Sequence, residues 1–111
     1  MKTAGIDIGS RTTKLVVLES GEIVHKEIAL STYDPIAICR KLLRGFEDVP
    51  IAAAGYGRLL FKEHFQCEVL TEIKAVTLGA RSLFPDCRAI LDIGGQDTKA
   101  ISLSEKGSID K

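Results

Sequence analysis

The chain has no tryptophan, two tyrosines and four phenylalanines, so aromatic residues make up only 5% of it. Proteins that hold single-stranded nucleic acid usually stack its bases on aromatic side chains, and this scarcity argues against such a platform. Lysine plus arginine and aspartate plus glutamate both number 15, which gives a net charge of zero. The composition therefore indicates neither a nucleic acid nor a membrane surface as a partner.

Cysteine is scarce as well, and long hydrophobic runs are absent. Cys39, Cys67 and Cys87 are odd in number and form no CxxC pair, which argues against a disulfide framework or a zinc site and favours reduced, mostly buried thiols. The N-terminus lacks the apolar run of a signal peptide, and no segment approaches the roughly 20 apolar residues of a membrane span. We therefore expect a soluble, cytoplasmic protein.

The apolar residues that are present, 45% of the chain, suffice for a modest core. Residues 3–8, 12–20 and 23–30 are rich in apolar and β-branched residues, and tight turns separate them, which predicts an antiparallel meander of three strands. At Asp34-Pro35 the pattern changes to helical spacing, with Asp34 as the expected cap and Gly45 as the expected end.

The rest of the chain predicts alternating elements. We expect a buried strand within 49–57, a short helix over 58–65, a brief strand at 67–70, a helix over 72–84 capped by Thr71, and a hairpin of 87–95 with 98–104, followed by a turn at 105–108. The order βββαβαβα, then ββ, predicts an α/β fold with helices packed on a mixed sheet. The final hairpin has neither a helix nor a third strand to cover it, and isolated hairpins are marginal in water. We therefore expect a fragment of a longer, two-domain protein.

One pattern occurs twice. The segment AGIDIGSRTTKLVVL at residues 4–18 matches AILDIGGQDTKAISL at residues 89–103, with an offset of 85 and seven of fifteen positions identical. The identities include the polar turn, with Asp7 matching Asp92 and Lys14 matching Lys99. This offset is too long for a solenoid repeat and indicates a duplicated domain.

The repeated turn suits a phosphate. Glycine lets the backbone bend close to a ligand, and successive N–H groups in such a turn form an anion-binding concavity. Two facing hairpins could hold a polyphosphate, with the two aspartates binding Mg²⁺ through water. The alternative is an ordinary strand end with a glycine turn. Neither copy is a Walker loop or a dinucleotide fingerprint.

With these residues in view, DIGSRTTK and DIGGQDTK resemble the two phosphate loops of the actin, sugar kinase and heat-shock chaperone ATPase superfamily, and TEIKAVTLGA (71–80) resembles its connecting helix. Together with AAAGYGR (52–58), they resemble the BadF/BadG/BcrA/BcrD ATPases, which activate 2-hydroxyacyl-CoA dehydratases and benzoyl-CoA reductases. This resemblance covers nearly the whole chain. It implies a ribonuclease H-like lobe of the actin-like ATPase fold over 1–88, with phosphate loop 1 and the connecting helix. Residues 89–111 would begin a second lobe, with phosphate loop 2.

The resemblance also implies an activity. ATP hydrolysis with Mg²⁺ would drive low-potential electron transfer to a CoA-thioester dehydratase or reductase, from a homodimer that shares one [4Fe–4S] cluster. The cluster cysteines and the adenine pocket would lie beyond Lys111, so Cys39, Cys67 and Cys87 are not assigned as ligands, and the isolated chain should hydrolyse little ATP. Arg11 departs from the family pattern, which usually has a small hydroxyl residue there.

Site roles follow from the same resemblance. Asp7 and Asp92 would position Mg²⁺, and Glu72 would orient the attacking water, although a first-turn glutamate that favours the helix dipole is the alternative. The phosphates would be held by two sets of residues: Gly9, Ser10, Arg11, Thr12, Thr13 and Lys14 in the first loop, and Gly94, Gly95, Gln96, Asp97 and Thr98 in the second. Turn formation alone would equally explain Gln96 and Asp97. We expect Lys99 to be a solvated strand residue.

Two other functions stay open at this point. One is a small-molecule kinase of the same superfamily, which would need a catalytic aspartate for a substrate hydroxyl, and no convincing candidate for it occurs in the sequence. The other is a non-catalytic, truncated lobe that only dimerises or docks.

Overall fold

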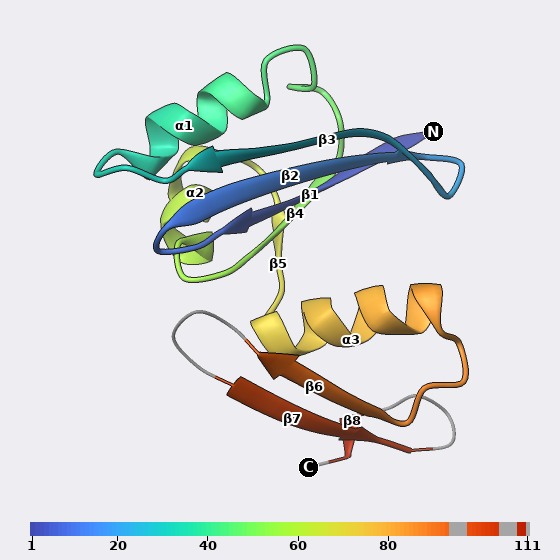
Figure 1. Cartoon of the computed structure of the whole chain (residues 1–111). Coiled ribbons are helices and arrows are strands. Elements are labelled where there is room, and N and C mark those ends of the chain that lie inside the picture. Colours follow the sequence, from blue (N-terminus) through green and yellow to red (C-terminus); the bar gives the residue numbers. More distant parts are fainter. Residues whose placement is uncertain (94–97, 105–108, 111) are drawn as a thin grey trace. The chain divides into compact units, whose positions relative to one another are not determined.

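The structure is a computed structural model that describes residues 1–93, 98–104 and 109–110. Contacts along the chain divide it into two compact units, Met1–Leu70 and Thr71–Lys111. The first unit contains seven elements (Figure 1): β1 (Lys2–Ile8), β2 (Thr12–Glu19), β3 (Glu22–Leu30), α1 (Pro35–Leu42), β4 (Ile51–Ala54), α2 (Arg58–His64) and β5 (Glu68–Val69). The second contains α3 (Glu72–Leu83), β6 (Ala89–Ile93), β7 (Thr98–Leu103) and β8 (Ile109–Asp110).

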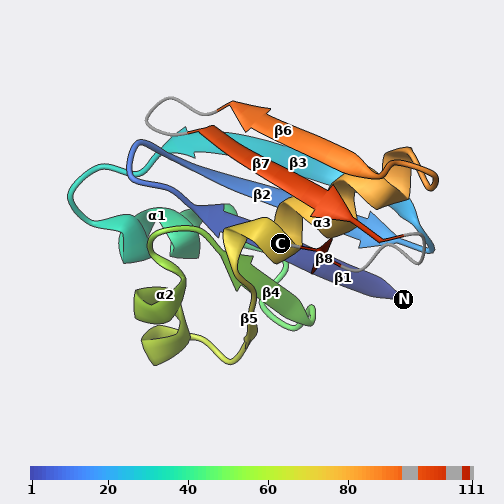
Figure 2. The ribbon, with the colours of Figure 1, turned by 90° about the horizontal axis from the view of Figure 1, so that it is seen from below.

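The first unit is built on a five-stranded mixed sheet in the order β3-β2-β1-β4-β5. The strands β1, β2 and β3 pair antiparallel, as the predicted meander requires, whereas β4 joins β1 and β5 joins β4 in parallel. Figure 2 shows β3, β2, β1 and β4 side by side in this order. The parallel additions place the ends of β1 and β4 at the same edge of the sheet, where loops can meet.

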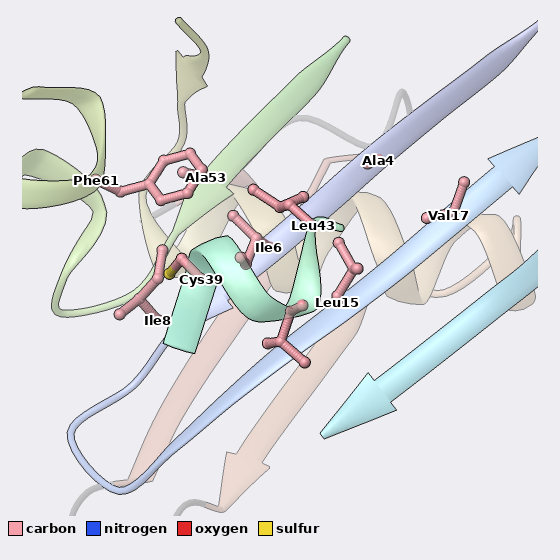
Figure 3. Packing of buried hydrophobic residues seen from close by; sticks show 10 residues of the cluster. Ala4, Ile6, Ile8, Leu15, Val17, Cys39, Leu43, Ala53 and Phe61 are labelled. Atoms are coloured by element: carbon pink, nitrogen blue, oxygen red, sulfur yellow. The ribbon is translucent and has the colours of Figure 1, made fainter. Parts of the chain in front are cut away.

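One face of this sheet forms the core. Along β1 and β2 every second side chain is buried, including Ile6, Ile8, Leu15 and Val17. These residues pack against Cys39, Leu42 and Leu43 at α1, against Phe61 of α2 and against Ala53 of β4, so both helices cover the same face. Figure 3 shows the Phe61 ring beside Ala53, and Cys39 and Leu43 beside Ile6. The intervening residues of β1 and β2, which include Asp7 and Lys14, therefore lie on the opposite face.

The two predicted helix N-caps are confirmed. The Asp34 carboxylate accepts a hydrogen bond from the Ala37 N–H at 3.2 Å, with Pro35 as the first helical residue. Thr71 Oγ1 accepts from the Lys74 N–H at 3.1 Å at the start of α3. Helix α1 ends at Leu42, three residues before the expected Gly45, and the chain turns before reaching that glycine at φ +91°.

The second unit consists of α3 lying against β6 and an antiparallel sheet in the order β6-β7-β8. The sequence predicted a final hairpin with neither a helix nor a third strand to cover it, and this is wrong, because β8 extends the hairpin and α3 packs on it. A two-residue strand is too short to show a periodic pattern. The predicted turn at 105–108 lies outside the described residues.

The structure groups α3 with β6–β8, whereas the sequence placed it in a lobe over 1–88. A compact unit is defined by the contacts within it, whereas a lobe is defined by the fold of the whole protein. The predicted lobe boundary at residue 88 therefore stays a prediction. Within the described part of the chain, no helix is long and apolar enough to cross a membrane.

Candidate functional site

The two copies of the repeated segment fold into hairpins with the same register. In the first, Asp7 lies opposite Lys14 and Ile8 lies opposite Thr13. In the second, Asp92 lies opposite Lys99 and Ile93 lies opposite Thr98. Adding 85 to each member of the first pairs gives the second pairs, so the duplication seen in the sequence is also a duplication of structure. Each hairpin thereby sets an acidic and a basic residue across from each other beside its turn.

The first turn is closed by its own backbone. The Gly9 N–H donates to the Thr12 carbonyl at 3.0 Å, which leaves Ser10 and Arg11 exposed at the tip. A Cβ on Gly9 would lie 2.8 Å from that carbonyl oxygen and 3.3 Å from Lys14 Nζ. Glycine is therefore required at position 9 by this close approach, as the turn chemistry predicts.

A buried pair of hydroxyls supports this turn from β2 and from the end of β3. Ser31 Oγ donates to the Gly9 carbonyl at 2.8 Å and lies 2.8 Å from Thr13 Oγ1. Because a hydroxyl has one proton, Thr13 is the donor in the second bond. The Ser31 N–H also donates to the Arg11 carbonyl at 2.9 Å. Ser31 thus bonds both ends of the loop.

This arrangement changes the reading of Thr13, which the sequence placed among the phosphate contacts. Its side chain is wholly buried on the helix-covered face of the sheet, and its hydroxyl is already bonded to Ser31. Thr12 and Lys14 alternate with it and lie on the other face. Thr13 therefore supports the turn from within the core, and the phosphate contact expected of it stays a prediction.

The charged pair of the first hairpin is partly exposed. Lys14 Nζ lies 3.4 Å from Asp7 Oδ2 and donates to the Thr12 carbonyl at 3.3 Å. The exposed fractions of the side chains are 38% for Lys14 and 49% for Asp7, so both remain open to solvent and to an incoming ligand. One cation and one carboxylate on the same small surface suit a phosphate and a divalent metal, respectively.

The loop after β4 closes over the end of β1. The Gly57 N–H donates to the Ile8 carbonyl at 2.9 Å, and Arg58 Nη1 donates to the Gly55 carbonyl at 3.0 Å. Gly55 is buried and has φ +94°, and a Cβ there would collide with Asp7 Oδ1. The sequence marked this AAAGYGR segment without assigning it a role at the site.

In the second unit, Lys99 differs from its counterpart. Its Nζ lies 2.9 Å from Glu72 Oε2, in the first turn of α3. The expectation that Lys99 is simply solvated is therefore wrong, since only 22% of its side chain is exposed. The bond brings the residue predicted to orient water next to the second hairpin. Asp92 is partly buried and Thr98 is exposed, while Gly94, Gly95, Gln96 and Asp97 lie outside the described residues.

All three cysteines carry free thiols. Cys39 is buried in α1, and Cys67 and Cys87 lie before β5 and before β6. Burial raises the pKa of the Cys39 thiol to about 11 and also raises the pKa of Cys67, which favours neutral thiols over the thiolates that bind metals. Within residues 1–93, 98–104 and 109–110, no cluster of three or more His, Cys, Asp or Glu side chains could hold a metal ion.

Sequence reasoning missed Ser31 and the proximity of Gly55 to Asp7. Ser31 lies in an ordinary Ser-Thr stretch after a strand, and nothing local marks it as a partner of Gly9. Gly55 was visible as a glycine after a strand, but its neighbour Asp7 is 48 positions away in the sequence. Both relationships arise from strand pairing in the folded sheet.

Comparison with known proteins identifies the family. The model of the BadF/BadG/BcrA/BcrD ATPase family matches residues 4–111. The chain belongs to this family. It is 38% identical, over 98% of its length, to the activator of lactoyl-CoA dehydratase from Anaerotignum propionicum, of which it covers 45%. The chain spans less than half the length of the curated relatives that it matches.

Two solved structures resemble it closely. The activator of the 2-hydroxyisocaproyl-CoA dehydratase from Clostridium difficile, with bound ADPNP, has a TM-score of 0.81 and 33% identity over 98% of this chain and 43% of that one. Component A of the (R)-2-hydroxyglutaryl-CoA dehydratase from Acidaminococcus fermentans has a TM-score of 0.83 and 30% identity over 100% of this chain and 46% of that one. The fold is accordingly the α/β, actin-like ATPase fold that the sequence predicted.

Proposed function

We propose that this chain is a portion of an ATP-hydrolysing activator, which drives low-potential electron transfer to a CoA-thioester dehydratase or reductase. The observation that carries the proposal is the identical register of the two hairpins, each of which places an aspartate opposite a lysine. The relatives named as dehydratase activators, one of them solved with bound ADPNP, support it.

In the first hairpin, the tip and one face would bind phosphate. Ser10 and Arg11 are exposed, and Thr12 and Lys14 share a face with Asp7. Hydroxyl and ammonium donors of this kind form charge-assisted hydrogen bonds with phosphate oxygens. Arg11 replaces a small hydroxyl residue with a cation that can bind two oxygens at once. Gly9, Thr13 and Ser31 would keep the loop in the shape that these donors require.

In the second unit, Glu72 would orient the attacking water. Its side chain is 45% exposed, so the carboxylate can accept a hydrogen bond from water while Lys99 holds it from one side. Gly94, Gly95, Gln96, Asp97 and Thr98 would contact the phosphates from the second loop. Lys99 then acts on the reaction through Glu72, as a positioning residue.

Asp7 and Asp92 suit Mg²⁺ better than the cysteines suit an iron–sulfur cluster. Carboxylate oxygens are the ligands that Mg²⁺ prefers, and the Asp7 carboxylate is half exposed, which leaves room for the waters that the ion retains. When bound, Mg²⁺ would neutralise charge on the phosphates. Burial raises the pKa of the Cys39 and Cys67 thiols, which does not suit the thiolates that ligate a [4Fe–4S] cluster. A cluster, and the homodimer that would share it, require ligands other than Cys39, Cys67 and Cys87.

Nucleotide binding tests the first part of the proposal. The purified gene product that carries this chain should bind Mg²⁺·ADPNP in isothermal titration calorimetry, and Asp7→Asn should weaken the binding about tenfold or more by removing a charged ligand. Asp48→Asn is the control, because Asp48 is an exposed carboxylate outside both hairpins. Absence of binding by the unsubstituted protein would overturn the assignment.

Electron transfer requires a separate test. Under anaerobic conditions, the gene product should consume ATP in proportion to the electrons that it passes to a 2-hydroxyacyl-CoA dehydratase or a benzoyl-CoA reductase. ATP turnover that depends instead on an added sugar or acid would identify a small-molecule kinase. ATP turnover with neither electron transfer nor a phosphorylated acceptor would contradict the activator assignment.

A further inference from the structure

The Gly55 turn lies directly against the carboxylate predicted to bind Mg²⁺. At φ +94° its backbone is in the left-handed region that favours glycine. A side chain at this position would meet three groups of β1: Asp7 Oδ1, the Ile8 carbonyl oxygen at 2.7 Å and the Ile8 carbonyl carbon at 3.0 Å. Real Cβ atoms essentially never approach the first two groups so closely, so the absent side chain is what lets Asp7 occupy its present place.

The turn that carries Gly55 is itself fixed. Its carbonyl accepts from the Arg58 N–H at 3.2 Å and from Arg58 Nη1 at 3.0 Å. Gly57 anchors the same loop to Ile8 through its N–H, and a Cβ on Gly57 would lie 2.5 Å from Ile8 Cγ2. The loop therefore cannot move away from β1 without losing several bonds, so a side chain at position 55 would displace Asp7 and press on the Ile8 carbonyl oxygen as well.

Asp7 is confined from the other side as well. Lys14 Nζ lies 3.4 Å from Asp7 Oδ2, while Gly55 faces Asp7 Oδ1. The position of Oδ2 is thus fixed by the charge of Lys14 on β2, and the position of Oδ1 by the space that Gly55 leaves free. A carboxylate confined in this way loses little side-chain freedom when it binds a ligand.

We propose that Gly55 is a positioning residue for Asp7, and that it sets the orientation in which the carboxylate receives magnesium. This inference rests on the function proposed above. It assigns the AAAGYGR segment to the metal site of the first unit, through the glycine and not through the neighbouring tyrosine or arginine side chains. The Asp7 side chain, 49% of which is exposed, is then available to a hydrated ion.

A matched pair of variants separates this role from the strain of a side chain at positive φ. Gly55→Ala and Gly45→Ala both put alanine at a positive φ, at +94° and +91°. Only the first meets Asp7, because a Cβ on Gly45 has nothing within 4 Å. In the protein without nucleotide, the carboxyl ¹³C signal of Asp7 should move in Gly55→Ala and stay in place in Gly45→Ala. An unmoved signal in a folded Gly55→Ala variant would overturn the proposal, whether or not the protein binds nucleotide.

Metal dependence gives the second readout. Gly55→Ala should raise the Mg²⁺ concentration for half-maximal ADPNP binding about tenfold or more, because small misplacements of a ligand-binding group have effects of this size, while Gly45→Ala should not. In an Asp7→Asn background the additional effect of Gly55→Ala should disappear. If it persists, Gly55 acts by another route and the proposal is wrong. If the unsubstituted protein does not bind nucleotide, the proposed function fails, and the Asp7 signal alone decides the role of Gly55.

Should Gly55→Ala fail to fold, Gly55→Asn replaces it, because asparagine tolerates a positive φ better than alanine does and still carries the Cβ that meets Asp7. The same displacement of the Asp7 signal and the same rise in magnesium requirement are expected of it. A folded Gly55→Asn variant with an unchanged Asp7 signal would contradict the proposal.

Discussion

Lys99 Nζ lies 2.9 Å from Glu72 Oε2, although the residue directly across the hairpin from Lys99 is Asp92. In the first hairpin the matching Lys14 stays with its cross-strand partner Asp7. The two copies therefore share their backbone register but differ in where the lysine bonds. This difference links the second hairpin to the helix that carries the candidate water-orienting residue.

The first prediction concerns this ion pair. Lys99→Met should reduce kcat for ATP hydrolysis by the purified gene product about tenfold, with little change in KM. Without its ion pair the Glu72 carboxylate is no longer held in one position, so it orients water less well. Stability should fall by less than about 1 kcal/mol, as is usual for a partly exposed pair. Lys99→Arg should restore most of the rate. An equal loss in both variants, or a change confined to KM, would show that Lys99 acts as a phosphate contact instead.

The second prediction concerns the hydroxyl pair beneath the first turn. Ser31→Ala removes the bond to Gly9 and leaves the buried Thr13 hydroxyl without its partner, which should lower the free energy of unfolding by about 1–3 kcal/mol. Adding Thr13→Val should recover part of this loss, since the buried Thr13 hydroxyl is then no longer left unpaired. Urea unfolding of the two single variants and the double variant measures the coupling. Simple additivity of the two losses would argue against the bond.

The third prediction compares Gly5 of β1 with Gly9, which follows that strand. Gly9→Ala should open the turn, because its Cβ would lie 2.8 Å from the Thr12 carbonyl oxygen, whereas a Cβ on Gly5 has nothing within 4 Å. Gly5→Ala is the control and should leave stability unchanged or raise it by about 0.5 kcal/mol, through reduced freedom of the unfolded chain. Only Gly9→Ala should weaken Mg²⁺·ADPNP binding in calorimetry. Equal affinities in the two variants would show that the shape of the turn does not matter.

The elements of the fold follow from local patterns. Alternation along β2 predicts Leu15 and Val17 on the buried face, and Asp34 and Thr71 cap their helices as their side-chain chemistry indicates. These features can be predicted from the sequence because strand periodicity and helix capping depend on neighbours within a few residues. The repeated DIG turn is readable for the same reason.

The relationships that the sequence did not reveal are all distant along the chain. Ser31 meets Gly9 because β3 returns alongside β2, and Gly55 meets Asp7 because β4 pairs in parallel with β1. Lys99 meets Glu72 because α3 packs beside the hairpin that follows it. No sequence periodicity predicts contacts between residues so far apart, and the hydroxyl of Thr13 suits both a phosphate and a buried partner.

The last prediction concerns pH. Burial raises the pKa of the Cys39 thiol from the ordinary 9.0 to about 11. Above pH 9 the unfolded chain therefore loses this proton while the folded protein keeps it, so the folded state binds more protons and stability must fall as pH rises. The contribution of Cys39 should decline by at most about 1.4 kcal/mol per pH unit between pH 9 and 11, and level off above that.

Cys39→Ala isolates this contribution, because other groups that titrate in the same range affect both proteins alike. The free energy of unfolding of the unsubstituted protein minus that of Cys39→Ala, measured by urea unfolding at intervals from pH 8 to 11, should stay level below pH 9 and then decrease. Alkylation at pH 8 should also label Cys39 after Cys67 and Cys87, because Cys39 alone is fully buried. Parallel pH profiles, or early labelling of Cys39, would mean that its thiol reaches water in the folded protein.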